Sequence, residues 1–478
     1  MARSSLLTRD FDGPIAWLTR DTADFKLHHD RSDQAISRQR FLQQANWLSQ
    51  RLPDTPAIVN EVDNRYLFLL TLCAASIRGI TCLLPQNRTP AVRTFLGDSY
   101  PDAVSVYDGR HREESGKPEP PGLNVSELPL FALRAGSGSA LNPAIADDHV
   151  AVVCFTSGST GDPKPLPKTW RILRESSRVN YRYFCSHPQS GTSFHYAGVP
   201  PQHMWGLETS VFLPLFADVC TVDAHAELPG DLIKQFSELP RPLTFIGTPL
   251  HLRALMATRM ATSRASAEAG RKQPITLDRV LCATSPLDEG IAAAIEEQFA
   301  TQVHEVYGCS EVGSMAHRRT AKDALWTRFE GMTFQVDDEN LVQAGTEYLG
   351  TSFTLGDRLE FVDSTHFRLA GRSDDLVKIA GKRGSLAAIH KVLFRYPALV
   401  DGAVFHPVER ASTTRLAAIV SLSSEGDLGT LKRYLATHLD STFVPRPIYV
   451  VDALPRQANG KLPQGRLLEL YERLNAGD

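Results

Sequence analysis

Hydrophobic and polar positions in the first part of the chain follow two patterns, one with the spacing of helices and one of short apolar runs typical of buried strands. Ser37–Leu52 has the spacing of an amphipathic helix, and Tyr66–Ile80 is apolar on all sides and predicts a buried helix that ends near Gly79. Short apolar runs at Ala57–Asn60 and Thr81–Leu84 predict strands. The apolar face of the first helix comprises Phe41, Ala45, Leu48 and Leu52. This alternation predicts βαβ units over a parallel sheet.

The later chain continues the pattern with several short apolar runs. Candidate strands are Val150–Phe155, Phe194–Val199, Leu243–Gly247 and Arg279–Ala283, and a candidate hairpin joins Arg358–Val362 to His366–Ala370 around Asp363–Ser364. Asp108–Gly122 is polar and proline-rich and predicts a surface loop, and the polar, alanine-rich segment Arg259–Gln273 predicts an exposed helix end and loop. Apolar stretches at Val404–Phe405, Leu416–Leu422 and Ile448–Val451 suffice for a small α+β domain. We therefore predict an α/β fold, with a large N-terminal domain of mixed and parallel sheets with flanking helices.

Length and composition narrow the class of protein. A chain of 478 residues predicts two or more domains, and contents of 42% hydrophobic and 22% charged residues are typical of a soluble globular protein. The net charge of −3 gives no reason to expect nucleic acid as a partner. Met1–Phe11 has no apolar core of a signal peptide, and no run of apolar residues is long enough to span a membrane. The seven cysteines are scattered, which favours free thiols in a reducing cytoplasm.

The strongest chemical signal is Thr156–Lys164, which reads T-S-G-S-T-G-D-P-K directly after a predicted buried strand. Four hydroxyl side chains and two glycines leave backbone N–H groups free to surround phosphate oxygens, and Lys164 adds a positive charge. A Walker A loop is excluded because no glycine directly precedes Lys164. A hydrolase elbow is excluded because neither Ser157 nor Ser159 has a glycine two residues before it. A polar surface turn is the remaining alternative.

This motif resembles the phosphate-binding loop of the adenylate-forming superfamily, which includes acyl-CoA synthetases, peptide-synthetase adenylation domains and luciferases. The resemblance implies that ATP activates a carboxylic acid to an acyl-adenylate, after which the acyl group usually passes to a thiol. It also implies that the loop binds the phosphates of ATP. The corresponding residues are Thr156, Ser157, Gly158, Ser159, Thr160, Gly161 and Lys164.

Two further segments resemble the walls of the family's acyl and adenine sites. Pro200, His203 and Gly206 match P-x-x-H-x-x-G, which lines the acyl pocket in relatives, and Trp205 is expected in the pocket wall or the core. A structural, hydrogen-bonded histidine is the alternative for His203. Ala283–Leu287 reads A-T-S-P-L where relatives have a G-G-A-P-L-like segment against adenine. The resemblance assigns Ser285 to that site, although the sequence departs from the pattern at Thr284 and Ser285.

The nucleotide site continues in two motifs. Tyr307, Gly308, Ser310 and Glu311 resemble Y-G-x-T-E, with serine in place of threonine. In relatives the aromatic ring lies along adenine, the hydroxyl contacts phosphate and the glutamate holds Mg²⁺, a role that suits a carboxylate. We expect the strand before this motif to end at Tyr307. Asp357 follows Leu355 and Gly356 in a T-G-D-like motif, and the resemblance implies that it binds the ribose hydroxyls.

The last motifs divide the chain. Gly371–Asp375 resembles G-R-x-D-D, in which Arg372 would reach the ribose or phosphate and Asp374 would be the hinge of a small mobile C-terminal domain. The predicted domains are therefore residues 1–373 and 374–478. Gly381, in the loop that follows, would line the path of the thiol. Lys461 belongs to an L-P-x-T-x-N-G-K-like motif, and its ammonium group would meet the carboxylate and α-phosphate during adenylation.

Two further sequence segments and the charge of the C-terminal region bear on the carboxylic acid substrate and on the thiol that accepts the acyl group. The phosphate motif continues as K-P-L-P-K-T-W and the pocket segment reads P-P-Q-H-M-W-G-L-E. Both resemble compact bacterial ligases of aryl-polyene and xanthomonadin-type clusters, which load aromatic acids on acyl carrier proteins. Residues 374–478 contain 14 Lys+Arg and 11 Asp+Glu, a net charge of +3 against −6 for the rest, which would suit an acidic carrier protein.

Three alternatives stay open at this point. The first is an acyl-CoA synthetase that uses free CoA with an aryl or fatty acid. The second is a non-catalytic ATP-binding regulatory protein on the same fold, which the changed adenine segment and Leu355 favour and the retained Lys461, Glu311 and Asp357 oppose. The third is a P-loop NTPase, which the missing G-K-[ST] opposes.

Overall fold

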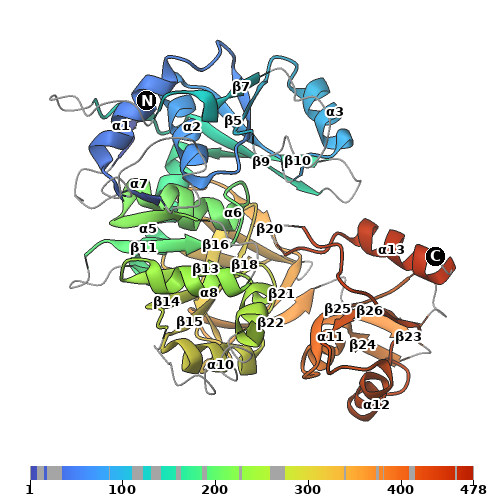
Figure 1. Cartoon of the computed structure of the whole chain (residues 1–478). Helices are drawn as coiled ribbons and strands as arrows, with labels where there is room; N and C mark the ends of the chain where they lie inside the picture. The colour runs from blue at the N-terminus through green and yellow to red at the C-terminus, as the bar shows by residue number, and fades with distance from the viewer. Residues whose placement is uncertain are drawn as a thin grey trace.

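The computed structural model describes residues 2–7, 15–18, 35–85, 87–109, 122–130, 141–157, 163–185, 191–224, 229–258, 275–338, 341–372, 376–379, 382–407, 415–457 and 460–476. Figure 1 shows two stacked lobes formed by the first three quarters of the chain, with the C-terminal region beside the lower lobe. Within the described ranges, no helix combines the length and apolar character needed to cross a membrane.

A six-stranded sheet with the order β10-β9-β5-β4-β6-β7 forms the first lobe. Its strands are parallel except for β10, which runs antiparallel to β9. The strands are β4 (Ala57–Glu61), β5 (Thr81–Leu84), β6 (Val104–Tyr107), β7 (Gly122–Asn124), β9 (Val150–Ser157) and β10 (Pro163–Thr169). The helices of this lobe are α1 (Arg38–Ser49), α2 (Arg65–Arg78), α3 (Pro90–Ser99) and the 3₁₀ turn η3 (Val125–Glu127), and β1 (Arg3–Ser5) pairs separately with β8 (Ala144–Ala146).

Local sequence signals explain the helices of this lobe. The Ser37 side chain accepts a hydrogen bond from the Arg40 amide and begins α1, whose predicted apolar face is buried. The Asn64 side chain caps α2 in the same way, and Gly79 ends that helix in the left-handed conformation at φ 70°. The predicted βαβ alternation is confirmed, since β4 pairs in parallel with both β5 and β6.

An eleven-stranded sheet with the order β21-β22-β17-β16-β15-β14-β13-β11-β12-β2-β3 forms the second lobe. Its strands are β2 (Ala16–Leu18), β3 (Ala35–Ile36), β11 (Ser193–Ala197), β12 (Val219–Asp223), β13 (Leu243–Gly247), β14 (Arg279–Cys282), β15 (Val303–Cys309), β16 (Gly313–Arg318), β17 (Trp326–Arg328), β21 (Asp357–Phe361) and β22 (His366–Arg372). The helical segments are α5 (Trp170–Phe184), α6 (Met204–Gly206), the π-helical turn η4 (Leu207–Phe212), α7 (Leu213–Phe216), α8 (Pro229–Glu238) and α10 (Glu289–Phe299). A separate sheet contains β18 (Met332–Val336), β19 (Val342–Thr346) and β20 (Ser352–Thr354).

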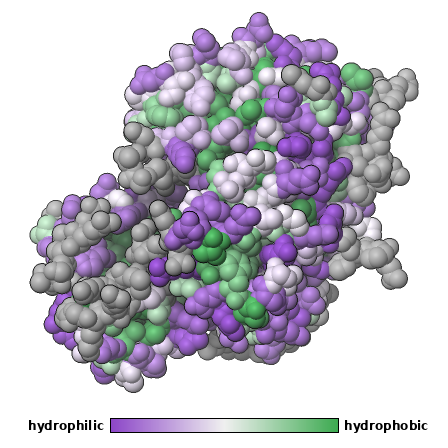
Figure 2. Space-filling model, turned by 180° about the vertical axis from the view of Figure 1, so that it is seen from behind, coloured by the Kyte–Doolittle hydropathy of each residue, from purple (hydrophilic) through white to green (hydrophobic). Residues whose placement is uncertain are grey.

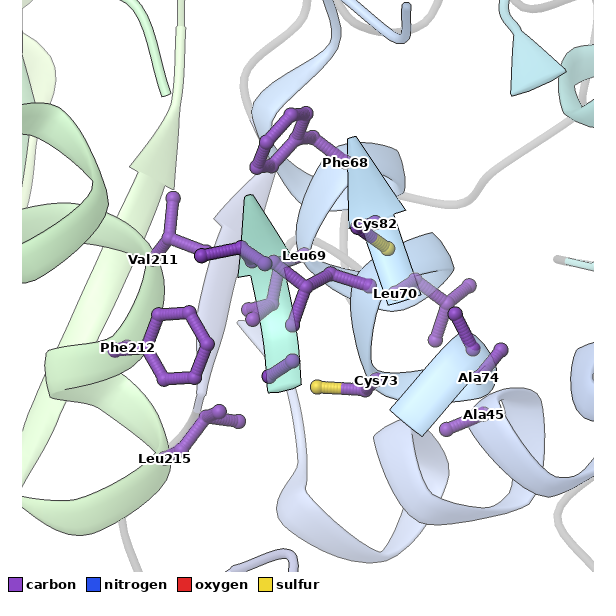
Figure 3. Close-up of a cluster of buried hydrophobic side chains, with 14 of the residues drawn as sticks. Ala45, Phe68, Leu69, Leu70, Cys73, Ala74, Cys82, Val211, Phe212 and Leu215 are labelled. Atoms are coloured by element: carbon purple, nitrogen blue, oxygen red, sulfur yellow. The ribbon is translucent and has the colours of Figure 1, made fainter. Parts of the chain in front are cut away.

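The two lobes share a hydrophobic core. Phe68 and Cys73 of α2 belong to the same buried cluster as Val211 and Phe212 of η4 and Leu215 of α7. Figure 3 shows Cys73 directed towards Phe212 and Leu215. Each of these five side chains is fully buried. The contact fixes the second lobe against the first, because removing either face would expose large apolar surface to water.

The C-terminal region has a core of its own. Its strands are β23 (Leu376–Ile379), β24 (Lys382–Ser385), β25 (Leu399–Phe405), β26 (Ala417–Leu422) and β27 (Ile448–Val450), and its helices are α11 (Leu386–Phe394), α12 (Leu428–His438) and α13 (Gln464–Ala476). The first strand pair is antiparallel, and the other three strands form one mixed sheet. Buried side chains from α11, α12 and this sheet pack in one cluster. The predicted α/β fold with a smaller α+β region at the C-terminus is therefore confirmed.

The surface and the cysteines agree with a folded globular chain. Hydrophilic residues predominate on the face that Figure 2 shows, with hydrophobic residues in scattered patches. All seven cysteines are free thiols, and five of them are buried. The predicted surface loop at Asp108–Gly122 lies almost entirely outside the described residues, and the predicted helix end and loop at Arg259–Gln273 lies wholly outside them.

Candidate active site

The carboxyl ends of the central parallel strands bring the predicted motifs to one edge of the second sheet. Strands β11, β13, β14 and β15 are parallel neighbours, so the segments that follow them emerge on the same side. These segments carry His203, Thr248, Ser285 and Glu311 in turn. Ligands of open α/β sheets bind at this edge, because loops from adjacent strands converge there.

The phosphate motif joins two antiparallel strands of the first sheet. Val150–Phe155 was predicted as a strand, and β9 continues to Ser157, which pairs with Pro163 at the start of β10. Thr156 lies opposite Lys164, whose side chain is exposed. The structure does not describe the middle of the motif, which includes Gly158, Ser159, Thr160 and Gly161. It also does not describe the side chains of Thr156 and Ser157. The two ends of the motif are thus paired with each other in β9 and β10, which together form the phosphate hairpin.

Two motifs of the predicted nucleotide site meet directly. The Tyr307 hydroxyl on β15 donates a hydrogen bond of 2.9 Å to Asp357 Oδ2 at the start of β21. Asp357 in turn lies opposite Arg372 on β22, whose side chain lies outside the description. Leu355 is buried with Tyr307 in one apolar cluster, which explains a leucine where the family pattern has threonine. The fold therefore gathers three residues that are far apart in the sequence.

A tight turn carries Ser310 and Glu311. The strand before it continues to Cys309, so the expected end at Tyr307 was wrong. A register shift between Tyr307 and Gly308 skips Met315 of β16 in the strand pairing. A Cβ at Gly308 would lie 2.4 Å from the Gly313 carbonyl oxygen. Glycine is therefore required at position 308 for close approach of β16 rather than for a special turn conformation.

Glu311 fits the requirements of a Mg²⁺ ion that also binds phosphates. Its carboxylate is partly exposed on the turn, and the turn contacts the phosphate hairpin because Lys168 Nζ on β10 donates to the Glu311 carbonyl. Across the described part of the chain, no three His, Cys, Asp or Glu side chains form a metal-binding group. A single carboxylate beside a phosphate loop is a usual donor set for Mg²⁺, which takes its other ligands from phosphates and water.

The His203 segment packs tightly over the ends of β11 and β13. A Cβ at Gly206 would lie 2.1 Å from the Pro200 carbonyl oxygen, so only glycine fits. Trp205 Nε1 donates to the Gly247 carbonyl at 3.3 Å, which fixes the indole at the end of β13. His203 precedes α6, and burial together with the nearby Lys461 charge lowers the pKa of its imidazole to about 4. The ring is therefore neutral near pH 7.

Lys461 belongs to a loop of the C-terminal region that reaches this same edge. Arg456 donates to both carboxylate oxygens of Asp401, at 2.6 and 2.7 Å, and to the Gly460 carbonyl at 2.9 Å. Gly460 has φ 80°, and a Cβ there would lie 3.5 Å from Thr248 Oγ1, just after β13. The structure thus brings together Lys461 and His203, which are 258 positions apart in the sequence.

The predicted adenine segment follows β14. Thr284 has φ 85°, a conformation that glycine adopts easily and a β-branched residue does not. Ser285 is exposed, and the Leu287 amide donates to Glu305 Oε1 at 2.8 Å, which holds the far end of the segment. No described contact links Ser285 to Tyr307, so its adenine role stays a prediction. Asp374 and Gly381, the predicted hinge and thiol-path residues, lie outside the described residues.

Three side chains near this edge had not been selected from the sequence. Lys168 and Glu208 are only 2% and 1% exposed and lie beneath the Glu311 turn. Thr248 meets the Lys461 loop. Lys168 lies in the K-P-L-P-K-T-W segment and Glu208 in the P-P-Q-H-M-W-G-L-E segment. The sequence does not indicate that they are buried, because their burial depends on contacts between distant elements.

These features define a nucleotide-binding α/β ligase of the adenylate-forming class. Residues 56–349 match the family described as AMP-binding enzyme, which is more than half of the chain. The chain belongs to this family, and it is an ATP-dependent, adenylate-forming enzyme.

Curated relatives show moderate identity over most of the chain. The chain is 27% identical over 343 residues to the 4-coumarate–CoA ligase of Halorhodospira halophila, covering 70% of this chain and 80% of that protein. It is 26% identical over 403 residues to the probable 2-succinylbenzoate–CoA ligase of Mycobacterium tuberculosis, covering 80% and 94%.

Solved structures share the fold at lower identity. ATP-bound MatB from Rhodopseudomonas palustris superposes with a TM-score of 0.73 at 17% identity, over 98% of this chain and 97% of that chain. The anthranilate CoA ligase AuaEII, in complex with anthranoyl-AMP, gives a TM-score of 0.69 at 16% identity, over 93% and 94%.

Proposed function

We propose that the chain activates a carboxylic acid with ATP and Mg²⁺ and transfers the acyl group to a phosphopantetheine thiol. In the first step a carboxylate oxygen attacks the α-phosphorus and pyrophosphate leaves. In the second step the thiolate sulfur attacks the acyl carbon and AMP leaves. The observation that carries this proposal is the position of the Lys461 loop, which lies against Thr248 at the end of β13, where Trp205 of the His203 segment is also fixed.

Lys461 would supply positive charge where negative charge develops. Its loop is held by Arg456, and its charge acts on the neutral imidazole of His203. An acid bound beside His203 would therefore lie near this ammonium group when it reacts at the α-phosphate. A preorganised charge of this kind stabilises the transition state more than the ground state.

The nucleotide would bind across the turn and the hairpin. Asp357 would accept hydrogen bonds from the ribose while it also accepts from Tyr307, and Arg372 would reach the ribose or phosphate. Ser310 and the hydroxyl-rich hairpin would bind phosphate oxygens. Glu311 would hold Mg²⁺, which supplies Lewis-acid stabilisation of the phosphates when it is bound.

We also propose that residues 374–478 form a mobile domain with its hinge at Asp374 and with Gly381 on the path of the thiol. Individual polar contacts join this region to the lobes among the described residues. Arg253 Nη1 donates to the Phe394 carbonyl at 3.3 Å, and Arg395 Nε lies 3.8 Å from Asp288 Oδ2. Contacts of this size are compatible with a rotation that exchanges the Lys461 face for the Gly381 face between the two steps.

The proposed substrate is an aromatic acid. Trp205 packs in one buried cluster with Phe184 and Phe329, directly beside the His203 segment. Aromatic and apolar walls suit a planar apolar acid. Relatives named as ligases of 4-coumarate and 3-hydroxybenzoate support this class of substrate. A carboxylate-dependent ATP–pyrophosphate exchange assay with a panel of acids tests it, and exchange with none of them would favour the non-catalytic ATP-binding alternative.

For the acceptor we favour the phosphopantetheine of an acyl carrier protein. The basic C-terminal region, with a net charge of +3, would attract an acidic carrier at modest ionic strength. The names of the curated relatives favour free CoA as the second candidate. Direct competition between CoA and a holo carrier protein from the same cell, read as kcat/KM for each thiol, separates them. Efficient acyl-CoA formation with negligible carrier loading would overturn the preference.

A further inference from the structure

A lysine is buried directly beneath the turn that carries Glu311. Lys168 lies on β10, within the K-P-L-P-K-T-W continuation of the phosphate motif, and is 2% exposed. Its Nζ donates a hydrogen bond to the backbone carbonyl of Glu311. Burial lowers the pKa of this lysine, and the nearby carboxylates of Glu208 and Glu311 oppose that shift. A buried cation is costly, so its place requires a compensating anion and hydrogen bonds.

Glu208 is the buried carboxylate at the other end of the same turn. Burial raises the pKa of its carboxyl group, and the hydrogen bond from Ser314 and the nearby charge of Lys168 oppose that shift. Glu208 lies in the π-helical turn η4 and is 1% exposed. Its Oε2 accepts a hydrogen bond of 2.7 Å from the Ser314 hydroxyl. Its Oε1 is so close to Gly313 that a Cβ there would lie 2.3 Å away. π-Helical turns occur often at functional sites, where they redirect a side chain.

The two side chains therefore hold the turn at both ends. Lys168 donates a hydrogen bond to the carbonyl of residue 311, and Glu208 accepts one from Ser314 and packs closely against Gly313. They come from two different elements, one continuing from the phosphate hairpin and the other from the His203 segment. We propose that Lys168 and Glu208 are positioning residues that fix the Glu311 carboxylate relative to the phosphate hairpin and thereby set the enzyme's affinity for Mg²⁺. This inference rests on the proposed role of Glu311 as the Mg²⁺ ligand.

The pair can be removed without leaving an unpaired buried charge. Changing only Lys168 or only Glu208 would leave the other as a buried group without its partner, which lowers stability for reasons unrelated to positioning. The double variant Lys168→Met with Glu208→Gln keeps similar volumes and removes both charges together. If the pair contributes only to stability, this variant will fold and bind Mg²⁺·ATP like the parent enzyme. If the pair positions the turn, it will fold but bind Mg²⁺ less tightly.

The readout is the Mg²⁺ concentration required for half-maximal ATP binding, measured calorimetrically on the full chain. We expect it to rise about tenfold in the double variant, because losing residues that orient a metal ligand typically costs 10–100-fold in metal affinity. ATP binding without Mg²⁺ should change little, and hydrogen exchange of the amides of residues 310–314 should become faster. A matched control removes the exposed pair Arg182–Glu330, whose groups lie 2.6 Å apart, through Arg182→Met with Glu330→Gln. This control should leave the Mg²⁺ requirement unchanged.

Further variants distinguish the possible failures. If the double variant does not fold, Ser314→Ala removes only Glu208's partner on the turn and should raise the Mg²⁺ requirement in the same direction. A folded double variant, or failing that Ser314→Ala, with an unchanged requirement overturns the positioning proposal. Glu311→Gln tests the proposed function separately. If it raises the Mg²⁺ requirement and the positioning variants do not, only the positioning proposal fails; if it too has no effect, Glu311 is not the ligand and both proposals fail.

Discussion

Thr284 shows how one residue can keep a backbone conformation that its side chain disfavours. Its φ of 85° and its exposed side chain mean that it strains the loop without burying apolar surface in return. Thr284→Gly should relieve strain of about 1–3 kcal/mol, less the entropy that glycine adds to the unfolded chain. We therefore expect a higher melting temperature by scanning calorimetry. Thr284→Ala keeps the Cβ and serves as control; equal melting temperatures for all three proteins would contradict this account.

Lys461 is the residue whose removal should separate the two half-reactions. Lys461→Ala should slow acyl-adenylate formation by about 10²–10³, the usual loss when a preorganised charge is removed from a developing anion. Thiolation of a supplied acyl-adenylate should be largely retained, because the proposed second step uses another face of the C-terminal region. Single-turnover measurements of each step check this. Equal losses in both steps would rule out the two-face proposal.

At the scale of elements, the segment after β11 depends on one close backbone contact. Gly206→Ala would place a Cβ 2.1 Å from the Pro200 carbonyl and push α6 away from β13, disturbing His203 and Trp205. We expect KM for the acid to rise at least tenfold with a smaller change in KM for ATP. Gly97→Ala in α3 is the matched control, since no atom lies within 4 Å of its Cβ position, and it should stabilise that helix slightly. Similar effects of the two substitutions would count against this role for Gly206.

Predictions from the sequence were most accurate for elements with strong local signals. The bounds of β5 and β13 agree with prediction, and α2 ends at Gly79 as expected, because burial patterns and a glycine C-cap are local properties. The strand that carries Tyr307 was predicted too short, because its last residues are held by pairing with β16 rather than by their own pattern. The motif order indicated which residues share a site, but the burial of Lys168 under Glu311 arises only when two sheets meet.

At the scale of the whole molecule, neutral histidines in buried and half-buried positions couple stability to pH. Burial, the first cause in each case, lowers the pKa of His195, His203, His251 and His304 to about 4. The unfolded chain protonates these groups near pH 6.5. Between pH 6.5 and 4 the unfolded state therefore binds more protons, so stability rises with pH in this window and is lost on acidification.

Urea unfolding at several pH values checks this prediction. The midpoint should fall as pH decreases from 6.5 towards 4. His195 Nδ1 lies 3.1 Å from the Thr209 carbonyl and therefore donates to it, so His195→Asn keeps a donor while it removes one titrating group. That variant should lose stability less steeply on acidification. If stability does not change with pH across the window, these rings take up protons in the folded chain as readily as in the unfolded chain, which would contradict the prediction.

The contact between the lobes and the C-terminal region should affect one step more than the other. Arg253 donates to the Phe394 carbonyl and stacks over its ring at 4.5 Å in the arrangement that brings Lys461 to His203. Arg253→Ala should therefore reduce adenylation about tenfold, since a pair of contacts of this kind contributes about 1.4 kcal/mol. Thiolation should change less. Arg182→Ala, on an exposed face, is the control, and equal losses in both steps would contradict a role in this arrangement.

The hairpin of β9 and β10 has a consequence for how the enzyme responds to ionic strength. In many nucleotide-binding folds a helix begins directly after the phosphate loop and directs its dipole at the anion. Here the chain enters a strand at Pro163, and α5 begins only at Trp170, so that helix does not point its N-terminus at the hairpin tip. Without that dipole, side-chain cations such as the exposed Lys164 should contribute a larger share of the long-range attraction for ATP. Dissolved ions screen such charges over about 8–10 Å, so the KM for ATP should rise steeply with added salt.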